Sequence, residues 1–352
     1  MTTNDAAGRR PEAAPSGATP RTLPDRYTSN AAFVQGRVAF ATRPFHDPDE
    51  LRDVWGDAWG ASTDVGRLRR VMLRRPGPEF DAIDLDRFDA EVGAAFDPDD
   101  RWYWCSSQPP DLAKMQRQHD QLVAVLQGFG VRTDVLDPLP GLYTKSIYMR
   151  DPLITVKGGA IIGRLAATMR RGEEAFVTRT VAGFGTPILG TITGTGVVEG
   201  GSLAKISPTV ALFGTSIRCN DEGASQLADL LRHQGITLIP VPISGFGFHI
   251  DGAMAMIDVD RALVLPGKVP HWLPDLLREH GISPIWVPEH EEWGVNGITI
   301  EPGHMLMSAS APRTAEILES IGVRVDVVDY DAIEANGGGV HCSTMELIRD
   351  DI

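Results

Sequence analysis

A cysteine near the C-terminal end stands shortly after three consecutive glycines, in the sequence Gly337-Gly338-Gly339-Val340-His341-Cys342. Glycine loses more backbone freedom on folding than any other residue, so such a run fits a close backbone approach where a Cβ would clash. A turn of this kind presents the Cys342 thiol, which becomes a nucleophile where its surroundings favour the thiolate. The same residues also fit an inert cysteine beside a C-terminal loop. Residues elsewhere in the sequence are needed to distinguish a nucleophilic Cys342 from an inert one.

Four more polar residues stand at equivalent places ahead of short apolar segments. Asp151 lies in Arg150-Asp151-Pro152, which comes directly before LITV, and Glu199 begins the segment that leads into SLAKIS. His249 and Asp251 lie in His249-Ile250-Asp251, just before AMAMI. Taken singly, these residues fit a turn, a solvated acid or a structural His–Asp hydrogen bond. Unrelated surface residues are not expected to take equivalent positions ahead of successive apolar segments. The pattern therefore indicates that these side chains and Cys342 meet at one site.

The chemistry of this set follows from its residue types. A thiol and a histidine provide a nucleophile and its acid–base partner. Three carboxylates are more than an acyl-transfer triad requires, but they pair well with a planar guanidinium, which offers several N–H donors. The set therefore predicts a thiolate aimed at the central carbon of a guanidinium held by acids. Close ligand pairs such as Cys-x-x-Cys are absent from the sequence, so neither a metal nor a cofactor is predicted.

The elements that position these residues recur along the chain as a helix end, a glycine and a short β-rich strand. Examples are LADLLRHQG followed by ITLIPV, and AEILESIG followed by VRVDVV. Each glycine stands where a helix C-cap needs a positive φ, and the interval is roughly 40 to 55 residues. Between these phrases lie pairs of apolar segments with the turn signals of hairpins. The glycines are Gly130, Gly185, Gly235, Gly281 and Gly322.

About five ββαβ units therefore follow one another, which predicts an α/β fold in which each unit buries its apolar face on the next. A doubly wound sheet is the alternative, but no Gly-x-Gly-x-x-Gly motif follows an early strand. Residues 1–26 are rich in Pro, Ala, Gly and Arg and are predicted to be a disordered arm. Residues 27–352 are predicted to form a single domain, with the residues up to about 63 packed on its outside.

Composition narrows the functional classes. The chain of 352 residues has a formal charge of −14 and no long basic tract, so it is not expected to bind nucleic acid. No apolar run approaches the length of a bilayer span, and the N-terminal segment lacks the apolar core of a secretory signal. Three widely separated cysteines predict a reducing, cytoplasmic location, with Cys105 and Cys219 packed and unreactive. The oligomeric state, including a homo-oligomer, is left open.

In these residues and motifs the chain resembles the guanidino-group modifying superfamily. That superfamily includes arginine deiminases, dimethylarginine dimethylaminohydrolases, agmatine deiminases and amidinotransferases. The resemblance extends from about Val71 to Leu347 and is most specific in YMRDP, VEGG, FHID and GGGVHC. It implies a five-bladed α/β propeller, or pentein, with the site at its centre. It also implies a small cationic guanidino substrate.

The resemblance implies a role for each matched residue. Cys342 would be the nucleophile, His249 the general acid and base, and Glu199 the support of His249 and of the guanidinium. Asp151 and Asp251 would hold the guanidinium nitrogens. The implied reaction passes through a covalent amidino-cysteine intermediate that water hydrolyses. Arginine would give citrulline and ammonia, and an N-methylated arginine would give citrulline and an alkylamine.

Other matches and departures concern the substrate. Arg170 and Arg218 each follow a site acid by nineteen residues, and arginines at these places in arginine deiminases bind the substrate's carboxylate. Ser202 replaces the aspartate of the family's EGGD, and Lys145 replaces an asparagine of arginine deiminases. Amidinotransferases tend to carry aspartate in place of Glu199, so hydrolysis is favoured over the alternative, amidino transfer to an amine. A non-catalytic binding protein of the same fold is the second alternative.

Overall fold

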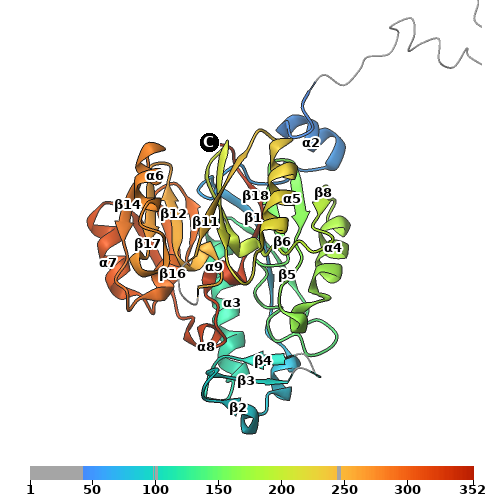
Figure 1. Ribbon diagram of the computed structural model, residues 1–352, viewed down its shortest axis with the longest axis vertical. Helices are drawn as coiled ribbons and strands as arrows, with labels where there is room; N and C mark the ends of the chain where they lie inside the picture. The colour runs from blue at the N-terminus through green and yellow to red at the C-terminus, as the bar shows by residue number, and fades with distance from the viewer. Residues whose placement is uncertain (1–42, 98, 100–101, 244–246) are drawn as a thin grey trace, which may run out of the picture. The chain divides into compact units, whose positions relative to one another are not determined.

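The computed structural model describes residues 43–97, 99, 102–243 and 247–352 (Figure 1). The predicted arm, residues 1–26, and residues 27–42 of the predicted extension lie outside the described residues. Residues from Pro44 onward form one compact unit. Among the helices of the described residues, none combines the length and the apolar character that a membrane crossing requires.

Five three-stranded sheets share one plan, in which a middle strand pairs antiparallel with one neighbour and parallel with the other. We call the antiparallel edge strand of each sheet its lead strand. In the order lead, middle and parallel strand, the sheets are β18 (Met345–Arg349), β1 (Leu68–Arg74) and β5 (Arg132–Leu136); β6 (Leu153–Val156), β7 (Gly159–Ile162) and β8 (Ile188–Thr191); β9 (Leu203–Ser207), β10 (Val210–Thr215) and β11 (Thr237–Pro242); β12 (Met254–Asp258), β13 (Arg261–Val264) and β14 (Ser283–Trp286); and β15 (Ile298–Glu301), β16 (His304–Ser308) and β17 (Arg324–Val328).

A helix joins the middle strand of each sheet to its parallel strand, because parallel neighbours need a crossover connection. These helices are α3 (Leu112–Gly128), α4 (Glu173–Gly183), α5 (Asp221–Arg232), α6 (Leu273–Glu279) and α7 (Pro312–Ser320). The five predicted cap glycines follow them with φ between 72° at Gly235 and 91° at Gly185. The predicted α/β class and the ββαβ plan are confirmed.

One unit boundary is not where the order of the repeats alone would place it. From that order the GGGVHC segment would end the fifth unit, but it leads into β18, the lead strand of the sheet built on β1 (Figure 1). The first sheet therefore combines strands from opposite ends of the described chain. The pairing register, with Met72 opposite Met345, is a long-range contact that no local pattern encodes.

The described part of the N-terminal extension contains α2 (Pro48–Trp55), which Asp47 caps by accepting hydrogen bonds from the first-turn amides. Trp59 follows and is buried in a cluster with Met72 and Leu347. A separate antiparallel sheet of β2 (Phe88–Asp89), β3 (Ala94–Asp97) and β4 (Trp102–Trp104) lies between β1 and α3 in the chain. Trp102 and Trp104 are buried, and the alternation of a strand directs Tyr103 to the opposite face.

The lead strands are linked to one another by polar side chains. Thr155 of β6 donates to the Glu346 carbonyl of β18 at 2.8 Å, and Lys205 of β9 donates to the Thr155 carbonyl at 3.1 Å. Thr299 of β15 donates to a β12 carbonyl at 2.7 Å, and Arg349 of β18 donates to the Thr299 carbonyl at 2.7 Å. Strands β9 and β12 are also in contact. Each lead strand thus touches two others.

These links surround a buried acid, Glu346, whose carboxylate pairs with Arg150 and, at 2.9 Å, with Lys205. Burial alone would raise the pKa of Glu346, but the charges of Arg150, Lys205 and Arg349 hold that pKa well below its usual range. Removing one partner of a buried ion pair is costly because the other charge stays desolvated. Glu346 therefore holds three cations in the interior.

We expect Glu346→Gln to lower the free energy of unfolding by about 3–5 kcal/mol, because the cations lose their shared carboxylate. Urea denaturation at neutral pH measures the effect. The matched control is Glu279→Gln at the exposed end of α6, which we expect to change stability by less than about 0.5 kcal/mol. Equal urea midpoints for the two variants would contradict this account of the interior.

Candidate active site

The residues that carry the predicted chemistry stand just ahead of four lead strands. Asp151 comes two residues before β6, and Glu199 precedes the 3-10 turn that enters β9. His249 precedes the 3-10 turn that enters β12, and that turn contains Asp251. Cys342 lies in α9 (Val340–Ser343), just before β18. Because the lead strands touch one another, these segments meet at the same end of their sheets.

The three glycines before Cys342 answer two different steric demands. Gly337 has φ of 91°, a conformation that favours glycine. A Cβ on Gly338 would lie 2.4 Å from the Tyr148 ring, and one on Gly339 would lie 2.7 Å from Oδ1 of Asn296. The run is therefore a close backbone approach, as the sequence predicted. Only a chain without side chains here can bring α9 against Tyr148 and Asn296.

The Cys342 thiol lies among carboxylates. Its Sγ is 3.6 Å from Oδ2 of Asp251, and Nδ2 of Asn296 donates to the sulfur at 3.2 Å. Burial, followed by the charges of Asp251 and Asp151, raises the pKa of Cys342 well above its usual value. These effects favour the thiol over the thiolate. A bound cation would offset the two carboxylates and favour the thiolate.

His249 and Glu199 form a buried hydrogen-bonded pair, with Nε2 of His249 2.7 Å from Oε2 of Glu199. Burial acts to lower the pKa of His249, but the carboxylates of Asp151 and Glu199 outweigh it and raise that pKa. Burial acts to raise the pKa of Glu199, but His249 and Arg218 hold it below its usual range. The pair therefore favours an imidazolium beside a carboxylate, which suits a proton donor.

The two carboxylate oxygens of Asp151 differ in their hydrogen bonding. Its Oδ2 pairs with Arg170, while Oδ1 is buried and has no hydrogen-bond partner among the described residues. This Oδ1 lies 3.5 Å from Nδ1 of His249, and it would lie 3.0 Å from a Cβ on Gly201. A buried carboxylate oxygen without a partner is costly, so this atom is suited to an N–H group of a ligand.

Asp251 is paired by a residue that the sequence reading did not single out. Nδ1 of His341 lies 2.8 Å from its Oδ2, the same oxygen that faces the Cys342 sulfur. Burial acts to raise the pKa of Asp251, but His341 and other nearby cations lower it. The ionised form of Asp251 is therefore favoured beside the sulfur, and His341 is its hydrogen-bond partner.

Both predicted substrate-binding arginines pair with site acids. Arg170 is buried, with ion pairs to Asp151 and, at 2.8 Å, to Glu173. Nη1 of Arg218 lies 3.0 Å from Glu199. Each guanidinium thus holds an acid in place, and binding of a substrate carboxylate by either stays a prediction. Arg218 is the less enclosed, with 12% of its side chain exposed against 3% for Arg170.

Beyond Arg218, the β2–β4 sheet contributes Tyr103, whose hydroxyl accepts a hydrogen bond from Nη2 of Arg218 at 3.1 Å. Lys145 lies with Nζ 3.9 Å from the centre of the Tyr103 ring, and it donates to Sγ of Cys105 at 3.2 Å. Cys105 is exposed, so the prediction that it is packed was wrong. The reason is that it follows β4 in a segment that has no counterpart in the repeat.

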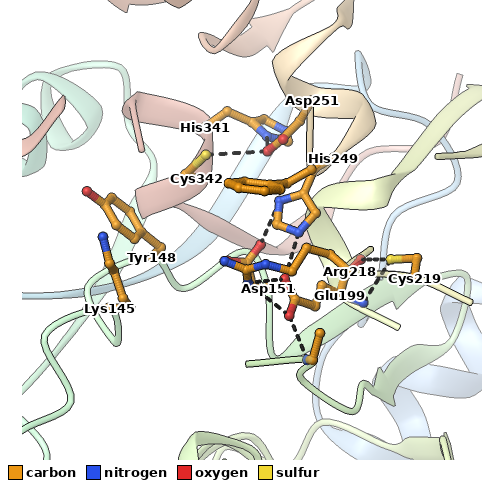
Figure 2. Close-up of polar contacts among 12 residues, drawn as sticks. Lys145, Tyr148, Asp151, Glu199, Arg218, Cys219, His249, Asp251, His341 and Cys342 are labelled. Carbon is orange, nitrogen blue, oxygen red and sulfur yellow. Dashed lines mark hydrogen bonds and ion pairs between the residues drawn. The ribbon is translucent and has the colours of Figure 1, made fainter. Parts of the chain in front are cut away.

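Figure 2 shows His249 between the Asp251–Cys342 contact and the Glu199–Arg218 pair. Cys219 lies behind Glu199, where burial raises the pKa of Cys219 to about 12, so this cysteine is packed as predicted. Asp151, Glu199, His249 and Cys342 stand ahead of the lead strands of four different sheets, and their convergence joins a nucleophile, a proton donor and acids.

A metal ion is the other occupant to consider. Asp151, Glu199 and His249 each offer a ligand atom, and these atoms lie within 4.8 Å of one another. However, Arg170 and Arg218 already neutralise the two acids, and the Glu199 hydrogen bond uses Nε2 of His249. Cations so close to the ligand atoms oppose a metal ion, so these residues fit an acid-supported imidazole better than a metal centre.

Comparison with known proteins agrees with this geometry. Residues 130–270 match the family model of arginine deiminase. The dimethylarginine dimethylaminohydrolase of Pseudomonas aeruginosa is 29% identical over 238 residues, which cover 68% of this chain and 90% of that protein. The Streptomyces coelicolor protein of the same name is 30% identical over 230 residues, which cover 65% of this chain and 84% of that protein. A solved structure of the Pseudomonas aeruginosa enzyme, a mutant in complex with citrulline, has a TM-score of 0.64 and 24% identity, covering 80% of this chain and 99% of that one.

Proposed function

Because the chain belongs to the guanidino-group modifying superfamily, we propose that it hydrolyses the guanidinium group of L-arginine or of an Nω-methylated arginine. The observation that carries the proposal is the buried Oδ1 of Asp151, which accepts no hydrogen bond from the described residues and lies 3.5 Å from Nδ1 of His249. A guanidinium N–H satisfies this oxygen and brings the positive charge that the neighbouring thiol needs in order to ionise. The products are citrulline and either ammonia or an alkylamine.

The reaction has two halves. A guanidinium held by Asp151 and Asp251 lowers the pKa of the Cys342 thiol, which loses its proton to solvent, and the thiolate attacks the guanidinium carbon. His249, supported by Glu199, gives its proton to the departing amine as the C–N bond breaks. The neutral His249 then takes a proton from water, which attacks the amidino-cysteine carbon. The C–S bond breaks and the thiolate is restored, while the hydroxyl that water added loses its proton to solvent as the ureido product leaves.

The five sheets are the blades of a closed five-bladed α/β propeller in this proposal. Its support is the circuit of contacts through the lead strands, from β18 to β6, β9, β12, β15 and back to β18. A central site at one end of the lead strands follows from such a closed arrangement. We also propose that the described residues from Pro44 to Ile352 act as one catalytic domain, and that three free cysteines reflect a cytoplasmic protein.

Amidino transfer to an amine is the alternative, and it shares the first half-reaction. Hydrolysis is favoured by the glutamate at position 199, where amidinotransferases tend to carry aspartate. The longer side chain reaches Nε2 of His249 at 2.7 Å, so the imidazole has a fixed partner for water activation. A non-catalytic binding protein would need neither the thiol nor the imidazole–acid pair.

Incubation with L-arginine and, separately, with Nω-methylated arginines tests the proposal. We expect citrulline without any acceptor amine, at a kcat of at least about 0.1 per second for the preferred substrate. Mass spectrometry of the acid-quenched protein is expected to find the amidino adduct on the peptide that contains Cys342. Ornithine formed only when an acceptor amine is present would instead establish the transferase, and no product with any of these guanidines would overturn the hydrolase proposal.

A further inference from the structure

The fifth lead strand, β15, also has a polar residue directly ahead of it. Asn296 comes two residues before β15, as Asp151 comes two residues before β6. Asn296 is 3% exposed, so it is as buried as the residues of the proposed site. All five lead strands therefore deliver a polar side chain to the same region, and Asn296 is the one to which the proposed reaction assigns no role.

Asn296 makes several hydrogen bonds with the segment that carries the nucleophile. Its Nδ2 donates to Sγ of Cys342 at 3.2 Å and to the Asp251 carbonyl at 3.1 Å. Its Oδ1 accepts from the Cys342 amide at 3.2 Å, and its carbonyl accepts from the His341 amide at 2.9 Å. The missing Cβ of Gly339 makes room for this arrangement. One side chain thus binds the nucleophile through its sulfur and its backbone.

The hydrogen bond from Nδ2 of Asn296 matters because most other groups around the Cys342 sulfur do not stabilise a thiolate. The titratable groups around the Cys342 thiol are Asp151, Asp251, His341, Tyr148 and Tyr330. The two acids disfavour a thiolate, and His341 is committed to Asp251. Asn296 provides a neutral N–H that favours the thiolate whether or not substrate is bound, since a hydrogen bond to the charged form of a group stabilises that form.

We propose that Asn296 is the positioning residue of the nucleophile: its carboxamide fixes the Cys342 backbone and donates to the sulfur, which aims and stabilises the thiolate. The role deepens the proposed function and rests on it for its catalytic meaning. The amide does not touch the guanidinium; it acts through Cys342. Its orientation is set by the Cys342 amide, because only the carbonyl oxygen can accept that N–H.

Two substitutions test the donor separately from the scaffold. Asn296→Asp keeps the shape and the acceptor for the Cys342 amide, but replaces the donor by a third carboxylate. Asn296→Ala removes donor and acceptor without adding charge. Alkylation of the substrate-free protein by iodoacetamide over a pH series, with peptide mass spectrometry to separate Cys342 from Cys105 and Cys219, follows the thiol itself. We expect the midpoint for Cys342 to rise by at least about one pH unit in Asn296→Asp and by less in Asn296→Ala.

Steady-state kinetics complete the test, with kcat expected to fall about 10- to 100-fold in both variants while KM stays within about threefold. The control is Asn220→Asp, where the new carboxylate still caps α5, and thermal melting confirms that each protein is folded. If Asn296→Asp does not fold, the alkylation midpoint of Cys342 in Asn296→Ala tests the proposal. An unchanged alkylation midpoint in the folded variants would overturn the proposal. This outcome is independent of hydrolysis, because the alkylation uses no substrate.

Discussion

Cys342→Ser is expected to lower kcat for the preferred guanidine by at least about 10,000-fold, because an alcohol does not ionise at neutral pH and attacks poorly without a strong base. The carboxylates beside the position make the loss severe, since Asp251 and Asp151 oppose any negative charge there. Steady-state kinetics measure the loss. The quenched Cys342→Ser protein is expected to carry no amidino adduct.

The matched control is Cys105→Ser, since Cys105 is exposed and touches Lys145 rather than the site acids. We expect this variant to retain kcat within about threefold. Cys342→Ser is also expected to keep its melting temperature, since Ser fills nearly the same volume. Turnover that survives in Cys342→Ser, or disappears in Cys105→Ser, would identify a different nucleophile and reject the mechanism.

Glu199→Gln is expected to have the second-largest effect, a fall in kcat of about 100- to 1,000-fold. Without the carboxylate, His249 loses its charged acceptor and its pKa falls, so fewer molecules hold the proton that the departing amine requires. The alkaline limb of the pH–kcat profile is therefore expected to move to lower pH. A profile with an unmoved limb would show that Glu199 does not act through His249.

Glu199→Gln is also expected to lower the free energy of unfolding by an amount that depends on pH. The depressed pKa of Glu199 contributes stability above its unfolded value near 4.3, and this is lost as the pH falls through the folded pKa. The raised pKa of His249 contributes stability below its unfolded value near 6.5, and this is lost as the pH rises through the folded pKa. The cost of Glu199→Gln, about 3–5 kcal/mol, is therefore expected to be largest near pH 5–6 in urea denaturation. A cost that stays the same as the pH rises from 5.5 through the folded pKa of His249 would contradict this linkage.

Local chemistry explains which features could be predicted from sequence. The cap glycines and the acids ahead of β6 and β9 carry their signals within a few residues, so the ββαβ plan and the convergence of the site could be derived. Asn296 had the same signal, but a Val-Asn-Gly sequence is also an ordinary turn, and its contact with Cys342 is not visible locally. The register that selected Asp151 would have selected Asn296 as well.

Features that depend on distant pairing could not be derived in this way. The pairing of Arg170 and Arg218 with site acids requires knowledge of side-chain directions that the sequence alone does not supply. The exposure of Cys105 depends on the β2–β4 sheet, which belongs to a single unit and has no repeat to compare with. The placement of GGGVHC depends on the pairing of β18 with β1, two strands from opposite ends of the described chain.

The partnership of β18 with β1 has a consequence for biosynthesis. Strand β1 leaves the ribosome well before β18, which is its neighbour at the antiparallel edge. Until then that edge offers free backbone groups to other chains. Cys342 is synthesised just before β18, in the same segment of the chain. A nascent chain therefore contains the proposed nucleophile only when it can also complete the sheet built on β1.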